Sequence, residues 1–106
     1  MNQIIPKKQI LANILEGSYR KIESVDDKRG LGVRIGVDTV ILISWQMLEA
    51  CFAALKSPTG YDTRFFQKEF PDKYAEHDCY VHVVGQIFVE SGLAVQKRRR
   101  YFAKPA

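Results

Sequence analysis

No stretch of the sequence approaches the roughly 20 consecutive apolar residues that a membrane-spanning helix needs. The first residues, Met1 to Lys8, also lack the basic head and the apolar segment of a secretory signal. Both absences argue against a membrane protein and against a secreted one. We therefore expect a soluble protein of the cytoplasm that has no membrane partner.

Cysteine is scarce, because Cys51 and Cys79 are the only two in a sequence of 106 residues. Two cysteines are too few for a scaffold built on disulfides, so we expect two buried thiols in a reducing compartment. His77, Cys79 and His82 are residue types that bind zinc, but no second cluster of cysteine or histidine completes a site. We expect no metal ion and no cofactor.

The motifs of common catalytic sites are missing as well. The glycines of the segment Arg29 to Gly32 lack the lysine and the spacing of a phosphate-binding loop. Ser44 follows an apolar segment, but it is not flanked by the glycines of a Gly-x-Ser-x-Gly elbow. We therefore expect a protein that is not an enzyme, and a small hydrolase is the third of three interpretations.

What the sequence does contain is the composition of a folded domain. Apolar residues make up 46% of it and charged residues 26%, which is ordinary for a globular protein. A chain of this length fits one domain and can bury a core of its own. No internal repeat and no linker rich in Pro, Gly or Ser divides it, so we expect residues 1–106 to form a single domain.

The positive charge is concentrated near one end of the chain. The sequence has 16 basic and 12 acidic residues, a formal net charge of +4. Residues 95–106 contain five of the basic residues and no acidic one, so the rest of the chain has 11 basic and 12 acidic residues, a charge of −1. A local cationic segment of this kind attracts phosphate groups or acidic partners.

Strands are expected in the first half of the chain. Apolar side chains alternate with small or polar ones from Leu31 to Val37, which is the strongest strand signal in the sequence. The segment 18–25 is a weaker candidate, and the turn residues Asp26 to Gly30 would join the two as a hairpin. The β-branched run from Thr39 to Ile43 predicts a further short, buried strand.

Two helices are expected on either side of these strands. The first runs from Pro6 to Glu16, where proline suits the first turn. Ser44 is a good N-cap for the second, which the segment Ser57 to Gly60 ends. The apolar face of this second helix comprises Trp45, Leu48, Cys51, Phe52 and Leu55.

Two more helices and a basic strand follow. Asp62 can cap a helix that Pro71 stops, and residues 72–76 are then a loop or a further helical turn. Asp78 can cap a last helix that runs to about Ser91, and residues 93–103 look extended. The expected fold is therefore α+β: an N-terminal helix, a small antiparallel sheet, three further helices and a C-terminal basic strand.

The last helix, the turn Ser91-Gly92-Leu93 and the basic strand after it together resemble the second half of a winged helix-turn-helix domain. In that family a recognition helix ends in a Gly-Leu turn, and a basic hairpin or strand, the wing, follows. Segments 44–56 and 62–70 would be the supporting helices. The segment 71–77 is longer than the family's tight turn, and the wing is too short for a hairpin unless residues 98–104 form its second strand.

The resemblance implies a non-catalytic nucleic-acid-binding module, such as a small transcriptional regulator. The four consecutive basic residues of the wing would neutralise phosphates and supply most of the affinity. His82 and Gln86 would face the groove, where Gln86 can pair with adenine, whereas Glu90 on the same face would repel phosphate. The residues assigned to binding in this way are Lys97, Arg98, Arg99, Arg100, Gln86 and His82.

Two other interpretations stay open. The basic residues can instead belong to a solvated edge strand whose charges prevent aggregation. The protein can also be a protein-interaction or small-ligand-binding domain, because its helices carry many aromatic residues for a small core. Some of these would then be exposed as a pocket lining or as the interface of a homodimer. They are Trp45, Phe52, Phe65, Phe66, Phe70 and Tyr74.

Overall fold

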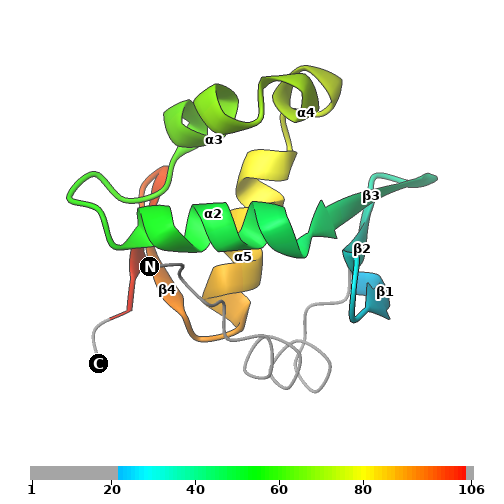
Figure 1. The fold of residues 1–106 in the computed structure, drawn as a ribbon, viewed down its shortest axis with the longest axis horizontal. Coiled ribbons are helices and arrows are strands. Elements are labelled where there is room, and N and C mark those ends of the chain that lie inside the picture. Colours follow the sequence, from blue (N-terminus) through cyan, green and yellow to red (C-terminus); the bar gives the residue numbers. More distant parts are fainter. Residues whose placement is uncertain (1–21, 105–106) are drawn as a thin grey trace.

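The computed structural model describes residues 22–104 and has a mixed α+β architecture, as the sequence predicts (Figure 1). The predicted helix from Pro6 to Glu16 lies outside the described residues. Among the described helices, none is long and apolar enough to cross a membrane. In chain order the elements are β1 (Ile22–Asp26), β2 (Gly30–Ile35), β3 (Thr39–Ser44), α2 (Trp45–Leu55), α3 (Thr63–Glu69), α4 (Pro71–Glu76), α5 (Tyr80–Glu90), β4 (Ala94–Lys97) and β5 (Arg100–Ala103).

Strands β1, β2 and β3 form one antiparallel sheet in that order, with the predicted hairpin between β1 and β2. Leu31 and Val33 of β2 are fully buried, so the alternation predicted a real strand. It extended the strand too far, however. Val37 is 83% exposed and lies in the turn to β3, where Gly36 adopts the left-handed φ of 66° that a tight reversal favours.

The short strand predicted from Thr39 to Ile43 is confirmed as β3, but only one of its faces is buried. Ile41 and Ile43 are buried, but Val40 and Leu42 are 48% and 40% exposed. Side chains alternate between the two faces of a strand, and here only one face packs into the core. Leu42 pairs with Gly32 on β2, which has no side chain to cover it.

Helix α2 begins directly after β3 at the predicted cap. The Ser44 side chain accepts a hydrogen bond from the Met47 amide at 3.1 Å. The five predicted residues of its apolar face are all buried, and Trp45 also donates its indole N–H to the Asp26 carbonyl at 2.9 Å. This bond joins the start of α2 to the end of β1. Cys51 is buried as expected, but Cys79 is only half-buried.

Helix α3 begins at its predicted cap, where Asp62 accepts from the Phe65 amide at 3.0 Å, and it ends before Pro71. Pro71 then occupies the first turn of α4, where its missing amide is not needed. Of the two alternatives for residues 72–76, the helical turn is therefore the one observed. Asp78 was wrongly predicted to cap α5. Cys79 precedes the helix, and no side chain caps it. The first two amides, those of Tyr80 and Val81, donate instead to carbonyls of the preceding turn, at 3.2 and 3.4 Å.

The C-terminal segment is a hairpin and not one extended strand. Strands β4 and β5 pair antiparallel around the two-residue turn Arg98–Arg99, in which Arg98 has a φ of 60°. Lys97 lies opposite Arg100, and residues opposite each other in a ladder share a face. The turn therefore brings Lys97 to the same side as Arg100, whereas a continuous strand would separate them.

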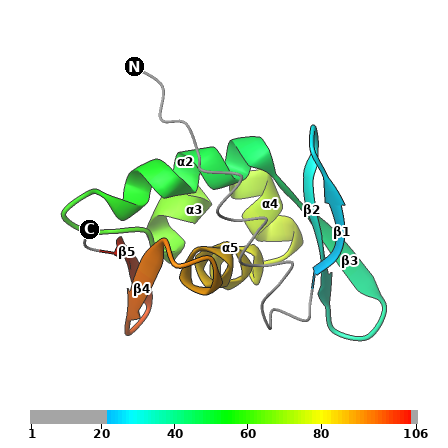
Figure 2. The same ribbon diagram turned by 90° about the horizontal axis from the view of Figure 1, so that it is seen from below.

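A third segment pairs with this hairpin. Tyr61, in the connection between α2 and α3, exchanges two backbone hydrogen bonds with Tyr101 of β5, at 2.8 and 2.9 Å. Both tyrosines are fully buried. The sheet β1–β2–β3 and the hairpin β4–β5 thus lie at opposite ends of α2, with α5 crossing beneath it (Figures 1 and 2).

Candidate nucleic-acid interface

The hairpin β4–β5 presents the predicted cationic residues to solvent. Lys97, Arg98, Arg99 and Arg100 are all exposed, and so is Lys104 just after β5. The geometry of the hairpin explains why these side chains are exposed. Its inner face holds the buried Tyr101, and no neighbouring element among those described covers its tip. The arrangement concentrates positive charge at the tip.

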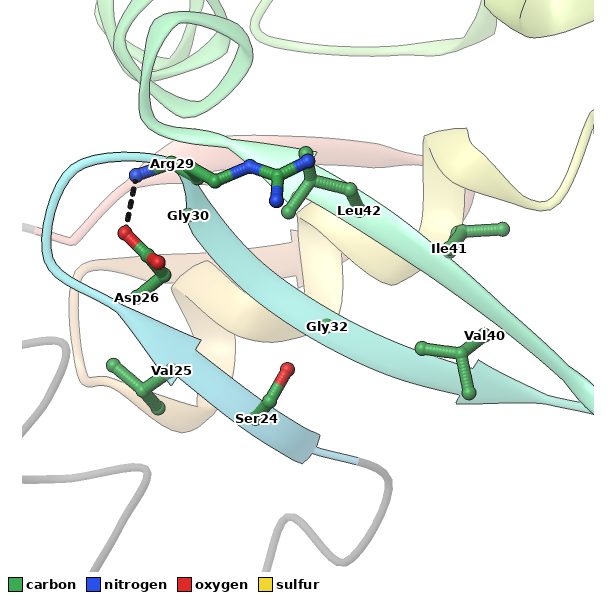
Figure 3. A pocket seen from close by; sticks show the side chains of 9 residues that line it. All are labelled: Ser24, Val25, Asp26, Arg29, Gly30, Gly32, Val40, Ile41 and Leu42. Atoms are coloured by element: carbon green, nitrogen blue, oxygen red, sulfur yellow. Dashed lines mark hydrogen bonds between the residues drawn. The ribbon is translucent and has the colours of Figure 1, made fainter.

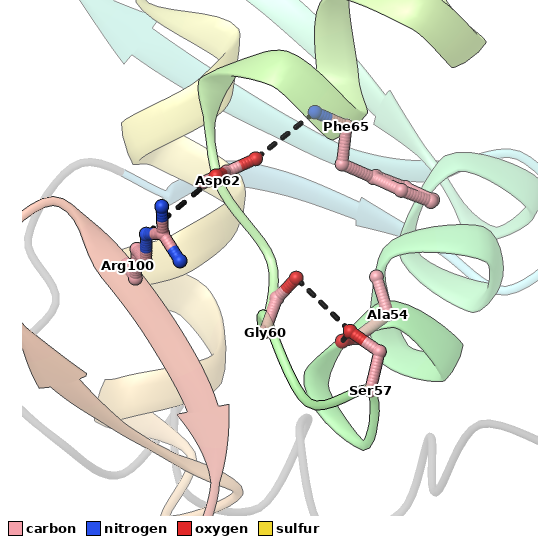
Figure 4. Close-up of polar contacts among 6 residues, drawn as sticks. All are labelled: Ala54, Ser57, Gly60, Asp62, Phe65 and Arg100. Atoms are coloured by element: carbon pink, nitrogen blue, oxygen red, sulfur yellow. Dashed lines mark hydrogen bonds and ion pairs between the residues drawn. The ribbon is translucent and has the colours of Figure 1, made fainter.

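One of these charges has an acidic neighbour. Arg100 Nε lies 3.8 Å from Asp62 Oδ2, with the two side chains 51% and 19% exposed (Figure 4). Asp62 is held in place because its other oxygen caps α3. A solvent-exposed pair at this distance contributes only about 0–1 kcal/mol. Within residues 22–104, the hairpin forms no other salt bridge.

Tyr101 fastens the hairpin to α5. Its hydroxyl lies 3.1 Å from His82 Nδ1, and its ring lies against Gly85 so closely that a Cβ atom there would overlap it. Burial raises the pKa of Tyr101, so the phenol beside His82 stays protonated. Gly85 is thus the residue that allows α5 and β5 to approach each other.

A second link runs from α5 to the basic turn. The Gln86 amide donates to the Gln96 side chain at 3.0 Å, and Gln96 donates in turn to the Arg98 carbonyl at 3.0 Å. This relay connects the middle of α5 with the residue that adopts the positive φ. The two amides therefore hold the conformation of the turn from which the arginines project.

The six residues that the sequence assigns to binding are thus gathered on α5 and the adjoining hairpin. Sequence reasoning did not identify three of the residues that join these two elements: Tyr61, Gly85 and Gln96. One signal was present. A glycine inside an apolar helix costs about 1 kcal/mol relative to alanine, which points to a close approach of another element at Gly85.

Acidic side chains stand at both ends of α5. Asp78 precedes the helix and Glu90 ends it, and both are exposed. Between Ile22 and Lys104, no three His, Cys, Asp or Glu side chains gather closely enough to hold a metal ion. The local chemistry of this part of the chain is cationic on the hairpin and acidic at the helix ends.

A second surface feature lies at the far end of α2. On the outer face of the sheet β1–β2–β3, a shallow pocket of about 320 Å³ lies over Gly32, with Ser24 on one side and Val40 and Leu42 on the other (Figure 3). Asp26 at its rim accepts hydrogen bonds from two turn amides, which lower the pKa of its carboxyl.

The helical aromatic residues are not exposed. Trp45, Phe52 and Phe66 are buried, and Phe65, Phe70 and Tyr74 are half-buried against the core. The expectation that some of them are exposed as a pocket lining or a homodimer interface therefore has no support in the described helices, because the four helices and the hairpin pack these rings together. Apolar exposure is found on the sheet instead.

No protein-family model, curated protein or solved structure matches this chain.

Proposed function

We propose that this protein is a non-catalytic nucleic-acid-binding module of the winged helix-turn-helix kind, with the hairpin β4–β5 as its wing. The observation that carries the proposal is the exposed cationic tip of a hairpin anchored to α5. Four basic side chains project from it, and the nearest acid, Asp62, lies 3.8 Å from only one of them.

The physical basis is the release of counterions from the nucleic acid. A protein that neutralises phosphates displaces condensed cations, and each contact lowers the slope of log K against log salt by about 0.9. Four contacts from the hairpin would give a slope of about −3.6. The affinity would therefore fall steeply between about 50 and 200 mM salt.

The order of elements supports the resemblance. Helices α2 and α3 precede α5, the helix in the recognition position, and the two-stranded hairpin follows it at once through Gly92 and Leu93. Gly92 has a φ of 77°, which suits the residue after a helix. Helix α4 occupies the segment that is longer than the family's usual turn.

The test compares two double variants that each remove two positive charges. Arg98→Ala with Arg99→Ala alters the hairpin, and Lys28→Ala with Arg29→Ala alters a turn at the opposite end of α2. Fluorescence anisotropy with a labelled duplex of mixed sequence measures the dissociation constant across a salt series. We expect the hairpin variant to reduce the salt slope by about 1.8, and the control to leave it unchanged. The proposal fails if the unaltered protein binds no duplex at low salt.

A second candidate function is association with another copy of this chain through the outer face of the sheet. The specific observation in its favour is that Val40 and Leu42 are exposed side by side along β3, next to the pocket over Gly32. Sedimentation velocity over a range of concentrations tests it. A concentration-dependent dimer that Leu42→Thr abolishes would support it, and a monomer at every concentration would refute it.

A further inference from the structure

Helix α5 offers very little surface to a ligand. Seven of its eleven residues are buried, and they cover the core side and the side that faces the hairpin. The polar residues that remain in the helix are His82, Gln86 and Glu90. Helix α5 contains no lysine or arginine.

The first two of these polar residues already bind the hairpin. His82 Nδ1 lies 3.1 Å from the Tyr101 hydroxyl, and the Gln86 amide donates to Gln96 at 3.0 Å. A glutamine that reads adenine must present its amide nitrogen and its oxygen together to one base edge. Gln86 would have to release Gln96, and with it the relay to Arg98, before it could do so.

The charges of α5 oppose a phosphate backbone close to the helix. Asp78 and Glu90, both exposed, flank the exposed stripe at its two ends. A duplex groove that took in this stripe would bring its phosphates near both carboxylates, where like charges repel. The cluster of four cationic side chains lies instead on the hairpin, and Lys104 follows it.

The hairpin also lacks what a single-stranded ligand needs. Binding of single strands relies on exposed aromatic rings on which bases stack. Tyr101 is fully buried, and Phe102 is half-buried with the Lys97 ammonium 5.8 Å from its ring centroid. Cationic groups without an exposed aromatic platform suit the regularly spaced phosphates of a duplex.

We propose, on the basis of the function proposed above, that the protein binds the phosphate backbone of a nucleic-acid duplex without reading its sequence. The hairpin makes the contacts, and contacts to phosphate carry no sequence information of their own. His82 and Gln86 are positioning residues, which hold the hairpin against α5 and shape its turn.

The first experiment measures binding to several labelled duplexes of unrelated sequence, together with selection from a randomised duplex pool. A bidentate contact from glutamine would discriminate between bases by about 5- to 150-fold. We expect all dissociation constants to agree within fivefold and the pool to yield no consensus. A preference of more than fivefold for a selected sequence would overturn this inference and leave the proposed function intact, whereas absence of binding to every duplex would overturn both.

Further arms identify the kind of nucleic acid. DNA and RNA duplexes share the same phosphate chemistry, so binding to either agrees with the inference. The duplex that binds more tightly identifies the kind of nucleic acid that the protein prefers. A single strand that binds more tightly than either duplex would contradict it. Matched ionic strength is needed in every arm, because affinities of this kind depend on salt.

Two variants separate positioning from base reading. We expect Gln86→Ala to weaken binding to every duplex by the same factor, because it loosens the hairpin without removing a charge. We expect Glu90→Gln to strengthen binding to every duplex, because it removes a repelling carboxylate. If Gln86→Ala weakens binding to some sequences and leaves others unchanged, Gln86 reads bases and the inference is wrong. Thermal unfolding of each variant checks that the fold is retained.

Discussion

The two ends of α2 carry antiparallel β structures that differ in charge and in how they are supported. The sheet β1–β2–β3 has three strands, and residues 22–44 hold three basic and four acidic side chains. Arg34 and Glu23 form an ion pair across it. The hairpin β4–β5 has two strands of four residues each, and its eight residues with the two of its turn include four cations and no acid.

The comparison shows why the hairpin needs anchors that the sheet does not. A two-stranded hairpin is marginally stable by itself, and neighbouring like charges destabilise it further. Tyr101 compensates for both effects, because it pairs with Tyr61, lies against Gly85 and contacts His82. The charged element is thus held by buried residues directly beside the arginines.

Replacing the anchor should have the largest effect. We expect Tyr101→Ala to lower the free energy of unfolding by about 3–5 kcal/mol, the usual cost of truncating a buried aromatic side chain. Val40→Ala, on the open face of the sheet, should change it by no more than about 0.5 kcal/mol. Urea unfolding followed by circular dichroism measures both. Equal effects at the two ends would contradict the argument that the hairpin depends on its anchor.

The close approach at Gly85 gives the next prediction. Gly85→Ala should destabilise the protein by about 1–3 kcal/mol, although alanine favours helices, because its methyl group overlaps the Tyr101 ring. In a Tyr101→Ala background the ring is gone, and the same substitution should then be neutral or stabilising. Urea unfolding of the four proteins gives the coupling between the two sites. Additive effects would show that the two residues do not interact.

The two helix caps offer a smaller and more selective comparison. Ser44→Ala at the sheet end and Asp62→Ala at the hairpin end should each cost about 0.5–2 kcal/mol of stability. Only Asp62→Ala should alter nucleic-acid binding, and it should strengthen it, because the carboxylate beside Arg100 is removed. Duplex anisotropy of both variants tests the difference. Identical binding by the two variants would show that Asp62 does not weaken the electrostatic attraction between the hairpin and the phosphates.

Acid should have the smallest effect, and it should act on the sheet end. The pKa of Asp26 in the folded protein lies below its usual value of 3.8, because the Arg29 and Lys28 amides donate to its carboxylate. Its contribution to stability is therefore complete above pH 3.8 and is lost as the pH falls through the lowered pKa. An NMR titration should show Asp26 titrating below its usual value of 3.8, and Asp26→Asn should remove this part of the acid sensitivity.

Much of the secondary structure could be predicted because its signals are local. The cap at Ser44 and the turn before Gly30 need only residues close to them in the chain, and the periodicity of α2 identifies its buried face. Asp62 was also recognised from its place before an apolar helix. The basic cluster was visible as a composition shift near the C-terminus.

Only the tertiary structure decided where these pieces meet. The reversal at Arg98 requires a positive φ from a non-glycine residue, and it is held by Gln96 and by the pairing of Tyr61 with Tyr101. The exposure of Val40 depends in the same way on which face of the sheet the helices cover. By itself the sequence determined most of the helical and extended segments within residues 22–104, and the cationic one, because backbone preferences and periodicity act over a few residues. The position of the hairpin against α5, and the bonds that occupy His82 and Gln86, arise from contacts between distant segments, which no local pattern records.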